Sequence, residues 1–345
     1  MRIVVVGPIF PDSFARNITF TLSAMGHELV VMPGTRAYHH QSRLPSLFWR
    51  YAPQAFPIIE RRMWSDLISR AKAFAPQLVL VSMGNLSPQT VDELKAACDA
   101  KVVCWYTDAI ANLYRHYLVA APYDAVFLKD PWAVRSLQAK LDIPFYYLPE
   151  ACNPSWHRTV ESTEQEQQKY RCDVAGIGSL HYFRAKMLEQ FVGYDLKIWG
   201  ANNPGWIETS VKPKYQNRSV AELEKAKALR SAKVVVNPTN FLEVEGVNCS
   251  LFEIAGCGAF QITESKPSLP QLFDEGTEIV TYRTRRELKE KVDYYLAHEQ
   301  ERQEIADRAQ RRAHREHTYE LRLKKMLETL GFLTPKDSAE STRSC

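Results

Sequence analysis

The sequence predicts an α/β fold made of two doubly wound halves, each with a parallel sheet between helices. Short β-branched runs alternate with helical segments along most of the chain, which is the pattern of parallel strands joined by crossover helices. The 345 residues exceed what one hydrophobic core usually takes, so two domains are expected. A polar stretch near the middle, Arg158–Lys169, separates two such alternating series.

The first half opens with a βαβ unit. Arg2–Val6 is a continuous β-branched run that ends at Gly7-Pro8, as expected of a buried parallel strand followed by a turn. Apolar residues on one face predict a helix over Ser13–Met25. Further strands are expected at Glu28–Met32, Gln77–Ser82, Lys101–Tyr106, Asp124–Leu128 and Phe145–Leu148, with helices at Ile58–Phe74 and Gln89–Cys98. The periodicity of Arg36–Pro57 is weak, so this region is expected to hold loop and short helix.

The second half repeats the pattern. Strands are expected at Cys172–Ile177, Asp195–Trp199, Lys233–Val236, Ala259–Thr263 and Thr277–Thr281, and helices at Arg184–Phe191, Val220–Ser231, Arg285–His298, Glu301–His317 and Tyr319–Leu330. The predicted division is a first domain (1–157), a linker (158–170), a second domain (171–317), a helix that crosses back to the first domain (318–333) and a disordered tail (334–345). Both domains are expected to be Rossmann-like.

Composition excludes several classes of function. A net charge of +4 fits a local anion site better than a nucleic-acid surface, for which a clustered basic stripe is usual. The seven scattered cysteines include no CxxC pair, which predicts a reduced compartment and no zinc site. No apolar run approaches the ~18 residues of a membrane helix, and the first residues do not form a signal peptide. We therefore expect a soluble cytoplasmic protein.

Two carboxylates stand near a predicted helix start, in the loop and helix that follow the strand at Lys233–Val236. Glu253 lies on the short helix, and Glu245 lies eight residues earlier in the loop. A carboxylate placed there can accept both hydroxyls of a ribose, while free N–H groups of the helix start attract a diphosphate. The alternative is a capping box, Ser250-x-x-Glu253, which needs no ligand. Capping at Asn248 instead would give two helical turns and leave Glu253 facing outward.

A glycine-rich turn opens the second half. The strand at Cys172–Ile177 contains Gly176 and runs into Gly178 and Ser179, and Arg184 lies on the helix that follows. Gly-x-Gly after a strand allows close backbone approach to phosphates, and an arginine offers a bidentate fork for them. A solvated helix charge is the alternative interpretation of Arg184. This sequence predicts a phosphate-binding loop in the domain that carries Glu253.

Other candidates lie at strand ends. Trp199 could stack on a nucleobase or belong to the core, and Asn237 and Asn248 are expected to line the same pocket. In the first half, Asp108 is the leading candidate for a catalytic carboxylate or an acceptor-hydroxyl ligand, and Asp12 is the second; both could instead cap a helix. His116, His157 and His181 are isolated in the sequence. The absence of HExxH, P-loop and GxSxG motifs disfavours metal-dependent single-domain transferases and serine hydrolases.

The stretch around the two glutamates resembles the C-terminal half of GT-B glycosyltransferases, in which two glutamates spaced E-x7-E precede an A-x-x-C/G-G turn. Here Glu245 and Glu253 precede Ala255-Gly256-Cys257-Gly258. The chain is more specifically similar to the CgeB-like, spore-maturation-protein-like glycosyltransferases. Four stretches carry that resemblance: WYTDA, YYLPEACNP, KIWGANNPGW and GVNCSLFEIAGCGAFQIT. It departs from them at Cys249-Ser250, where an arginine is common.

The resemblance implies a GT-B fold, in which the first domain binds an acceptor and the second a nucleoside-diphosphate sugar (UDP-, GDP- or TDP-sugar). It places Glu253 on the ribose, Arg184 on the diphosphate and Glu245 near the donor sugar. The implied enzyme transfers a sugar to a glycan, protein or small-molecule hydroxyl without a metal or a tightly bound cofactor. An epimerase of the same fold and a non-catalytic glycan- or protein-binding module are the alternatives.

Overall fold

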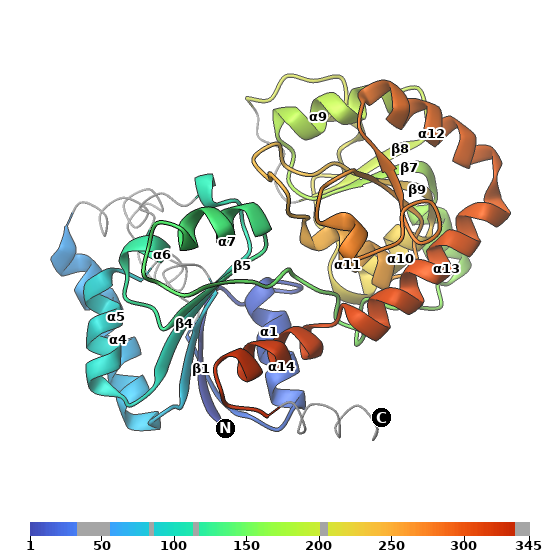
Figure 1. Ribbon diagram of the computed structural model, residues 1–345. Helices are drawn as coiled ribbons and strands as arrows, with labels where there is room; N and C mark the ends of the chain where they lie inside the picture. The colour runs from blue at the N-terminus through green and yellow to red at the C-terminus, as the bar shows by residue number, and fades with distance from the viewer. Residues whose placement is uncertain (33–55, 83–85, 113–116, 201–205, 335–345) are drawn as a thin grey trace. The chain divides into compact units, whose positions relative to one another are not determined.

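The computed structural model describes residues 1–32, 56–82, 86–112, 117–200 and 206–334 and divides the chain into two compact units (Figure 1). Unit 1 comprises residues 1–148 and the chain from Leu323 onward, and unit 2 comprises Pro149–Arg322. Each unit contains one sheet, and every strand pairing in both sheets is parallel. The predicted α/β class with two parallel sheets is confirmed.

The strands of unit 1 are β1 (Arg2–Val6), β2 (Glu28–Met32), β3 (Leu78–Val81), β4 (Lys101–Tyr106), β5 (Ala125–Leu128) and β6 (Phe145–Tyr147). They pair in the order β2-β1-β3-β4-β5-β6. The helical segments are α1 (Phe14–Ala24), α4 (Pro57–Phe74), α5 (Pro88–Ala97), η1 (Ile110–Asn112), α6 (Tyr117–Ala120) and α7 (Pro131–Gln138). In Figure 1, α4 and α5 lie on one face of this sheet and α1 lies on the other.

The β-branched runs form strands because both faces of the sheet are covered. On β1, Val4 and Val6 belong to the core cluster that contains Leu67 of α4, while Ile3 and Val5 alternate with them and are equally buried. Successive side chains of a strand point to opposite faces, so a run without polar residues is stable only between two helical layers. This burial explains why continuous runs predicted the strands.

Unit 2 contains β7 (Cys172–Ile177), β8 (Leu196–Trp199), β9 (Ala232–Asn237), β10 (Gln261–Glu264) and β11 (Val280–Tyr282), in the order β11-β10-β9-β7-β8. Its helical segments are α8 (Glu164–Tyr170), α9 (Tyr182–Leu188), η2 (Glu189–Phe191), η3 (Lys212–Lys214), α10 (Glu222–Arg230), α11 (Cys249–Gly256), η4 (Leu269–Gln271), α12 (Arg285–Ala297) and α13 (Glu299–Glu316).

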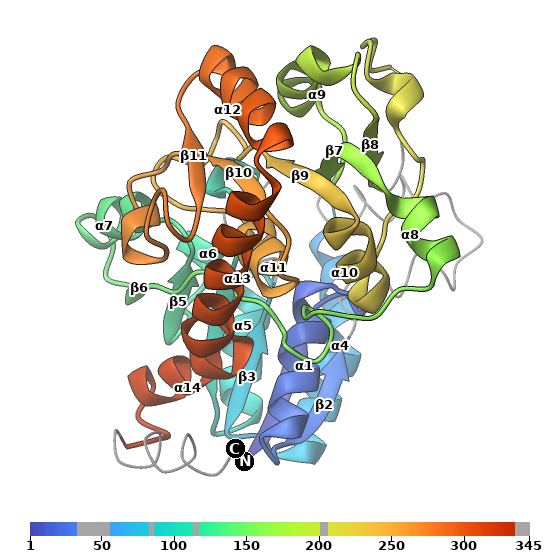
Figure 2. The ribbon, with the colours of Figure 1, turned by 90° about the vertical axis from the view of Figure 1, so that its right-hand side faces the viewer.

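The two faces of the second sheet have separate cores. Val234 and Val236 of β9 belong to a cluster with residues of α9 and α12, whereas Val235 belongs to a cluster with Ala226 of α10 and Ile254 of α11. Figure 2 shows these two pairs of helices on opposite sides of β9. The alternation along β9 therefore fixes which helices cover which face.

The last helix, α14 (Tyr319–Thr329), contains the point at which the chain passes from unit 2 to unit 1. The N–H of Tyr319 donates to the Cys152 carbonyl at 3.1 Å within unit 2. Beyond the helix, the Lys101 ammonium donates to the Leu330 carbonyl at 2.6 Å and lies 5.5 Å from the ring centroid of Phe332, within unit 1. These contacts assign Leu330 and Phe332 to unit 1.

The predicted linker at 158–170 requires a correction, because α8 occupies its second part. Thr163 and Glu166 form a capping box, with the Thr163 hydroxyl accepting the Glu166 N–H at 3.3 Å and the Glu166 carboxylate accepting the Thr163 N–H at 3.0 Å. Lys227 of α10 adds an ion pair to Glu166 at 2.7 Å, and Tyr170 is buried. Polar caps and pairs thus stabilise a helix that lacks an apolar stripe.

Some predictions fall outside the described residues, namely most of Arg36–Pro57 and the tail after Thr334. Within the described ranges, no helix is long and apolar enough to cross a membrane.

Trp105 tests the core of unit 1. The ring is fully buried, its Nε1–H donates to the Leu148 carbonyl at 3.0 Å, and it meets Phe14 edge-on with 4.7 Å between ring centroids. Trp105→Phe leaves a buried carbonyl without this donor and removes buried volume, so we expect the free energy of unfolding to fall by about 1–3 kcal/mol in urea denaturation. The control is Trp132→Phe, since Trp132 is 48% exposed, and it should change stability by less than about 0.5 kcal/mol. Equal losses of stability in the two variants would contradict the assignment of Trp105 to the core of unit 1.

Candidate functional site

The topology of unit 2 singles out the edge where β7 and β9 end. The chain leaves β7 toward β8 on one side and returns to β9 on the other side of β7, so the strand order reverses between β7 and β9. The two strands are in register, with Gly176 opposite Val236, and their carboxyl ends lie together. Parallel α/β sheets bind ligands outside the carboxyl ends of their strands at such a reversal. Gly178 and Asn237 stand at these two ends.

The loop after β7 depends on glycine at position 178. Gly178 has φ +103°, a conformation that L side chains rarely adopt, and its N–H donates to the Trp199 carbonyl at 2.8 Å. A Cβ atom at this position would lie 2.9 Å from a terminal nitrogen of Arg184. The same nitrogen of Arg184 donates to the Ser179 carbonyl. Glycine at position 178 therefore lets the Arg184 guanidinium pack directly onto the loop. The predicted phosphate-binding loop requires Gly178, Ser179 and Arg184 to lie together in this way.

Arg184 is a cation in a poorly hydrated place. Burial lowers the pKa of its guanidinium, which nevertheless stays charged at neutral pH. Its Nε atom is buried without a hydrogen-bond partner, and no carboxylate in the described part of the chain forms an ion pair with it. An arginine with unused donors is suited to bind an anion such as a phosphate. Both interpretations of Arg184, as a phosphate ligand and as a solvated helix charge, stay predictions.

His181 caps the helix that carries Arg184. Its Nδ1 accepts the Arg184 N–H at 3.3 Å, which makes it the N-cap residue of α9. Burial, followed by the charge of Arg184, lowers the pKa of the imidazole to about 4, so the ring is neutral at pH 7. His181 thus contributes a neutral cap to the loop.

The prediction that Trp199 could stack on a nucleobase needs a correction. Its side chain is 3% exposed, meets Tyr170 with 5.6 Å between ring centroids and lies under the Arg218 guanidinium at 5.3 Å. A ring packed in this way cannot also stack on a nucleobase. The part of Trp199 that serves the loop is its backbone carbonyl, which accepts the Gly178 N–H.

Asn237 and Asn248 bind each other. The Asn237 amide donates to the Asn248 side-chain oxygen at 3.1 Å, and the Asn248 amide donates back at 2.9 Å. Asn237 also donates to Gln261 at 3.3 Å, and Gln261 donates to the Leu251 carbonyl at 2.8 Å. This network joins the end of β9, the start of β10 and the first turn of α11. The two asparagines therefore fix the loop, and their contact with a nucleotide stays a prediction.

Asn248 is the N-cap of α11, and its side chain accepts the Leu251 N–H at 3.1 Å. The Ser250–Glu253 capping box is therefore wrong, and the alternative cap is confirmed. The outward direction expected for Glu253 is also wrong, because this residue is only 5% exposed. Its Oε2 accepts a hydrogen bond from Lys225 of α10 at 2.9 Å, which supplies the opposite charge that burial of a carboxylate requires.

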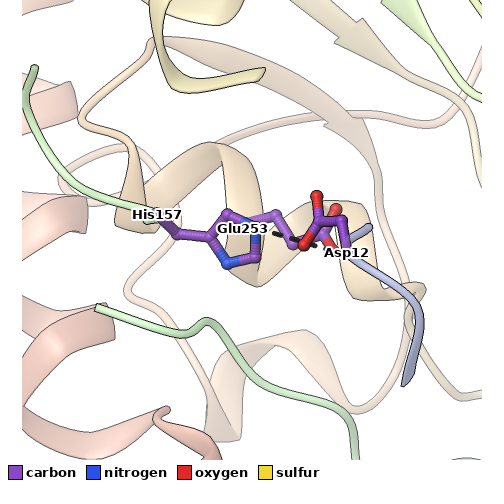
Figure 3. Close-up of side chains that lie close together, drawn as sticks. All are labelled: Asp12, His157 and Glu253. Carbon is purple, nitrogen blue, oxygen red and sulfur yellow. Dashed lines mark ion pairs between the residues drawn. The ribbon is translucent and has the colours of Figure 1, made fainter. Parts of the chain in front are cut away.

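His157 approaches the same carboxylate, with 4.0 Å between its Nε2 and Oε1 of Glu253 (Figure 3). The ring is fully buried, and its Nδ1 accepts the Asn153 N–H at 2.9 Å. In the neutral ring the proton is then on Nε2, the atom that faces Glu253. Sequence reasoning did not predict that Lys225 and His157 lie beside Glu253, because neither residue stands in a motif.

Glu245 lies in the loop between β9 and α11 and is half-buried. Its backbone carbonyl accepts two hydrogen bonds from Ser268, at 3.2 Å from the N–H and 2.6 Å from the hydroxyl. Two residues earlier, the Glu243 carbonyl accepts from the buried Lys266 ammonium at 2.8 Å. The segment after β10 thus holds the backbone of the loop that presents Glu245.

In unit 1 the two predicted aspartates differ in position. Asp108 follows β4, is exposed, and accepts the Ala109 N–H at 2.8 Å just before η1. Asp12 lies between β1 and α1 with φ +63°. The strand order of unit 1 reverses between β1 and β3, so the β1 loop is the one at a reversal. His116 lies outside the described residues.

Comparisons with known proteins agree with this architecture. Residues 183–328 match the family model described as glycosyl transferase-like. Sucrose-phosphate synthase from Thermosynechococcus elongatus has a similar structure, with a TM-score of 0.70 at 12% identity over 96% of this chain and 98% of that one. HepE of Anabaena, solved with UDP and glucose, gives a TM-score of 0.67 at 12% identity over 96% and 100%. The fold is therefore that of GT-B glycosyltransferases.

One curated protein is similar to this chain in sequence. The spore protein CgeB of Bacillus subtilis (strain 168) is 22% identical over 284 residues, which are 76% of this chain and 87% of CgeB. The resemblance to CgeB-like glycosyltransferases drawn from the four sequence stretches is thus confirmed.

Gly200 offers a test of the loop geometry. A Cβ atom there would overlap the Gly178 carbonyl oxygen and the Tyr215 hydroxyl and lie 2.8 Å from the Gly178 carbonyl carbon. Backbone cannot move away cheaply, so Gly200→Ala should destabilise the protein by about 1–3 kcal/mol in urea denaturation. Gly193→Ala is the control, since its Cβ would meet nothing within 4 Å, and it should be neutral within about 0.5 kcal/mol. A neutral Gly200→Ala would show that the loops do not approach so closely.

Proposed function

We propose that this protein is a nucleoside-diphosphate-sugar-dependent glycosyltransferase whose donor site is the β7–β9 edge of unit 2. The observation that carries the proposal is the placement of Arg184 and Glu253 after neighbouring strands at the strand-order reversal. HepE, which has a similar structure, binds UDP and glucose, and this supports the choice of ligand.

Each residue of the site has a proposed role. Arg184 binds the diphosphate together with the backbone of Gly178 and Ser179, because its guanidinium has a buried Nε donor without a partner. Glu253 accepts the ribose hydroxyls. Asn248 contributes by capping α11, and Glu245 faces the transferred sugar.

The reaction needs a leaving group and a proton acceptor. The bond between the anomeric carbon and the diphosphate oxygen breaks, and the acceptor oxygen forms a new bond to that carbon as its proton passes to a base. The negative charge that develops on the diphosphate is stabilised by Arg184, which supplies a fixed positive charge without solvent reorganisation. Asp108 and Asp12 remain the candidate carboxylates of unit 1. Transfer is proposed to occur in the cytoplasm and to involve no nucleic acid.

Nucleotide binding tests the donor site directly. We expect calorimetric titration with UDP, GDP and TDP to detect binding of at least one of them. Arg184→Ala should weaken that binding about tenfold or more, because a charge-assisted hydrogen bond to phosphate is lost. The control is Lys186→Ala on the same helix, where the exposed ammonium pairs with Glu189 at 3.0 Å; it should leave affinity unchanged. Failure of all three nucleotides to bind would reject the proposal.

Metal independence makes a second prediction. If Arg184 provides the positive charge for the leaving diphosphate, an excess of EDTA should leave the rate of sugar transfer unchanged, and added Mg²⁺ or Mn²⁺ should not raise it by more than about twofold. Activity is followed as nucleoside diphosphate released in the presence of acceptor. The same assay without acceptor, with analysis of the sugar, separates transfer from epimerisation. Loss of activity in EDTA that Mg²⁺ restores would contradict a metal-free mechanism.

A further inference from the structure

The pair formed by Lys225 and Glu253 is buried on both sides. The Lys225 ammonium lies 2.9 Å from Glu253 Oε2, and the side chains are 9% and 7% exposed. Surface pairs of this protein are different, as in Arg286 and Glu290, whose side chains are 89% and 66% exposed. Exposed pairs contribute little, whereas two buried charges pay a large desolvation cost and are often less stable than an apolar pair of similar volume. Stability alone is therefore a weak reason for Lys225 to be a lysine.

The position of Lys225 on its helix is also unfavourable for a lysine. It is the fourth residue of α10, which begins at Glu222, so its backbone belongs to the first turn, where N–H groups carry partial positive charge. A cation is disfavoured there, and the N-cap residue Ala221 offers no side-chain cap. Glu253 of α11 supplies the compensating charge. The lysine is thus matched to the carboxylate of the neighbouring helix.

The geometry leaves the carboxylate available for further donors. An ionised carboxylate has about four acceptor positions on its two oxygens, and Lys225 occupies one of them on Oε2. Oε1 faces His157 at 4.0 Å, which is longer than a hydrogen bond. Lys225 therefore holds one oxygen of Glu253 in place without filling the acceptor positions of the carboxylate.

We propose that Lys225 is a positioning residue of the donor site, which holds the Glu253 carboxylate in the direction needed to accept two neighbouring hydroxyls of a nucleotide ribose. This inference rests on the proposed function, because it presumes that Glu253 is the ribose ligand. Lys225 acts through Glu253 and makes no contact of its own with the nucleotide.

A double-mutant cycle tests this relation. The variants are Lys225→Met, Lys225→Arg, Glu253→Gln and Lys225→Met combined with Glu253→Gln, and each is titrated calorimetrically with the nucleoside diphosphate that the unchanged protein binds. We expect Lys225→Met to weaken binding about tenfold or more and Lys225→Arg to restore it to within about threefold. The double variant should bind no more weakly than Glu253→Gln, because Lys225 has nothing left to position.

A matched control and a second comparison keep the test decisive. Lys227→Met removes a lysine of the same helix whose ion pair is with Glu166, and it should leave nucleotide affinity unchanged. If Lys225→Met fails to fold, the comparison of Glu253→Gln with the double variant remains, since that double variant contains neither buried charge. Circular dichroism and the thermal midpoint establish folding at the temperature of titration.

Each outcome has one meaning. Nucleotide binding that survives Lys225→Met would overturn the positioning role while leaving the proposed function intact. A double variant that binds about tenfold more weakly than Glu253→Gln would also overturn it, because Lys225 would then contact the nucleotide itself. Absence of binding by the unchanged protein would reject the proposed function and this inference together.

Discussion

The parallel pairing of β7 with β9 is the constraint on which the candidate site depends. Both strands are buried on both faces, and their register sets Gly176 beside Val236, so the loops that follow start from neighbouring points. The connections that leave β7 and lead into β9 run to opposite sides of β7, the arrangement at which parallel sheets bind ligands. The site is therefore a consequence of strand order, and its side chains determine only which ligand it suits.

The sequence predicted the strands well because parallel strands between two helical layers must be continuously apolar. The same logic failed at α8, whose sequence EQEQQKY buries only Tyr170 and has no apolar stripe. What stabilises that helix is a capping box and an ion pair with Lys227, and neither produces a hydrophobic period. Short polar helices of this kind are invisible to periodicity.

The site was predictable where backbone chemistry limits the choice of residue. Gly178 stands where φ is positive, and Asn248 is a helix cap, so both leave a signal in the sequence. Lys225 leaves no such signal in the sequence. Its helix is mostly charged, so a buried lysine there cannot be distinguished from a solvated lysine. The sequence suggested that Trp199 could stack on a nucleobase. Its ring is instead covered by Tyr170 and Arg218, and sequence patterns do not show such contacts because these residues come from other parts of the chain.

The charges of the site match the two halves of the proposed ligand. Arg184 is poorly hydrated and, among the residues with described positions, pairs with no carboxylate, so a bound anion would complete its charge balance. Glu253 is already balanced by Lys225, and a second cation would upset that balance. Neutral hydroxyl donors are what a compensated carboxylate accepts most readily. A ligand with an anionic diphosphate beside a neutral sugar satisfies both conditions, whereas an inorganic anion or a cationic ligand satisfies at most one.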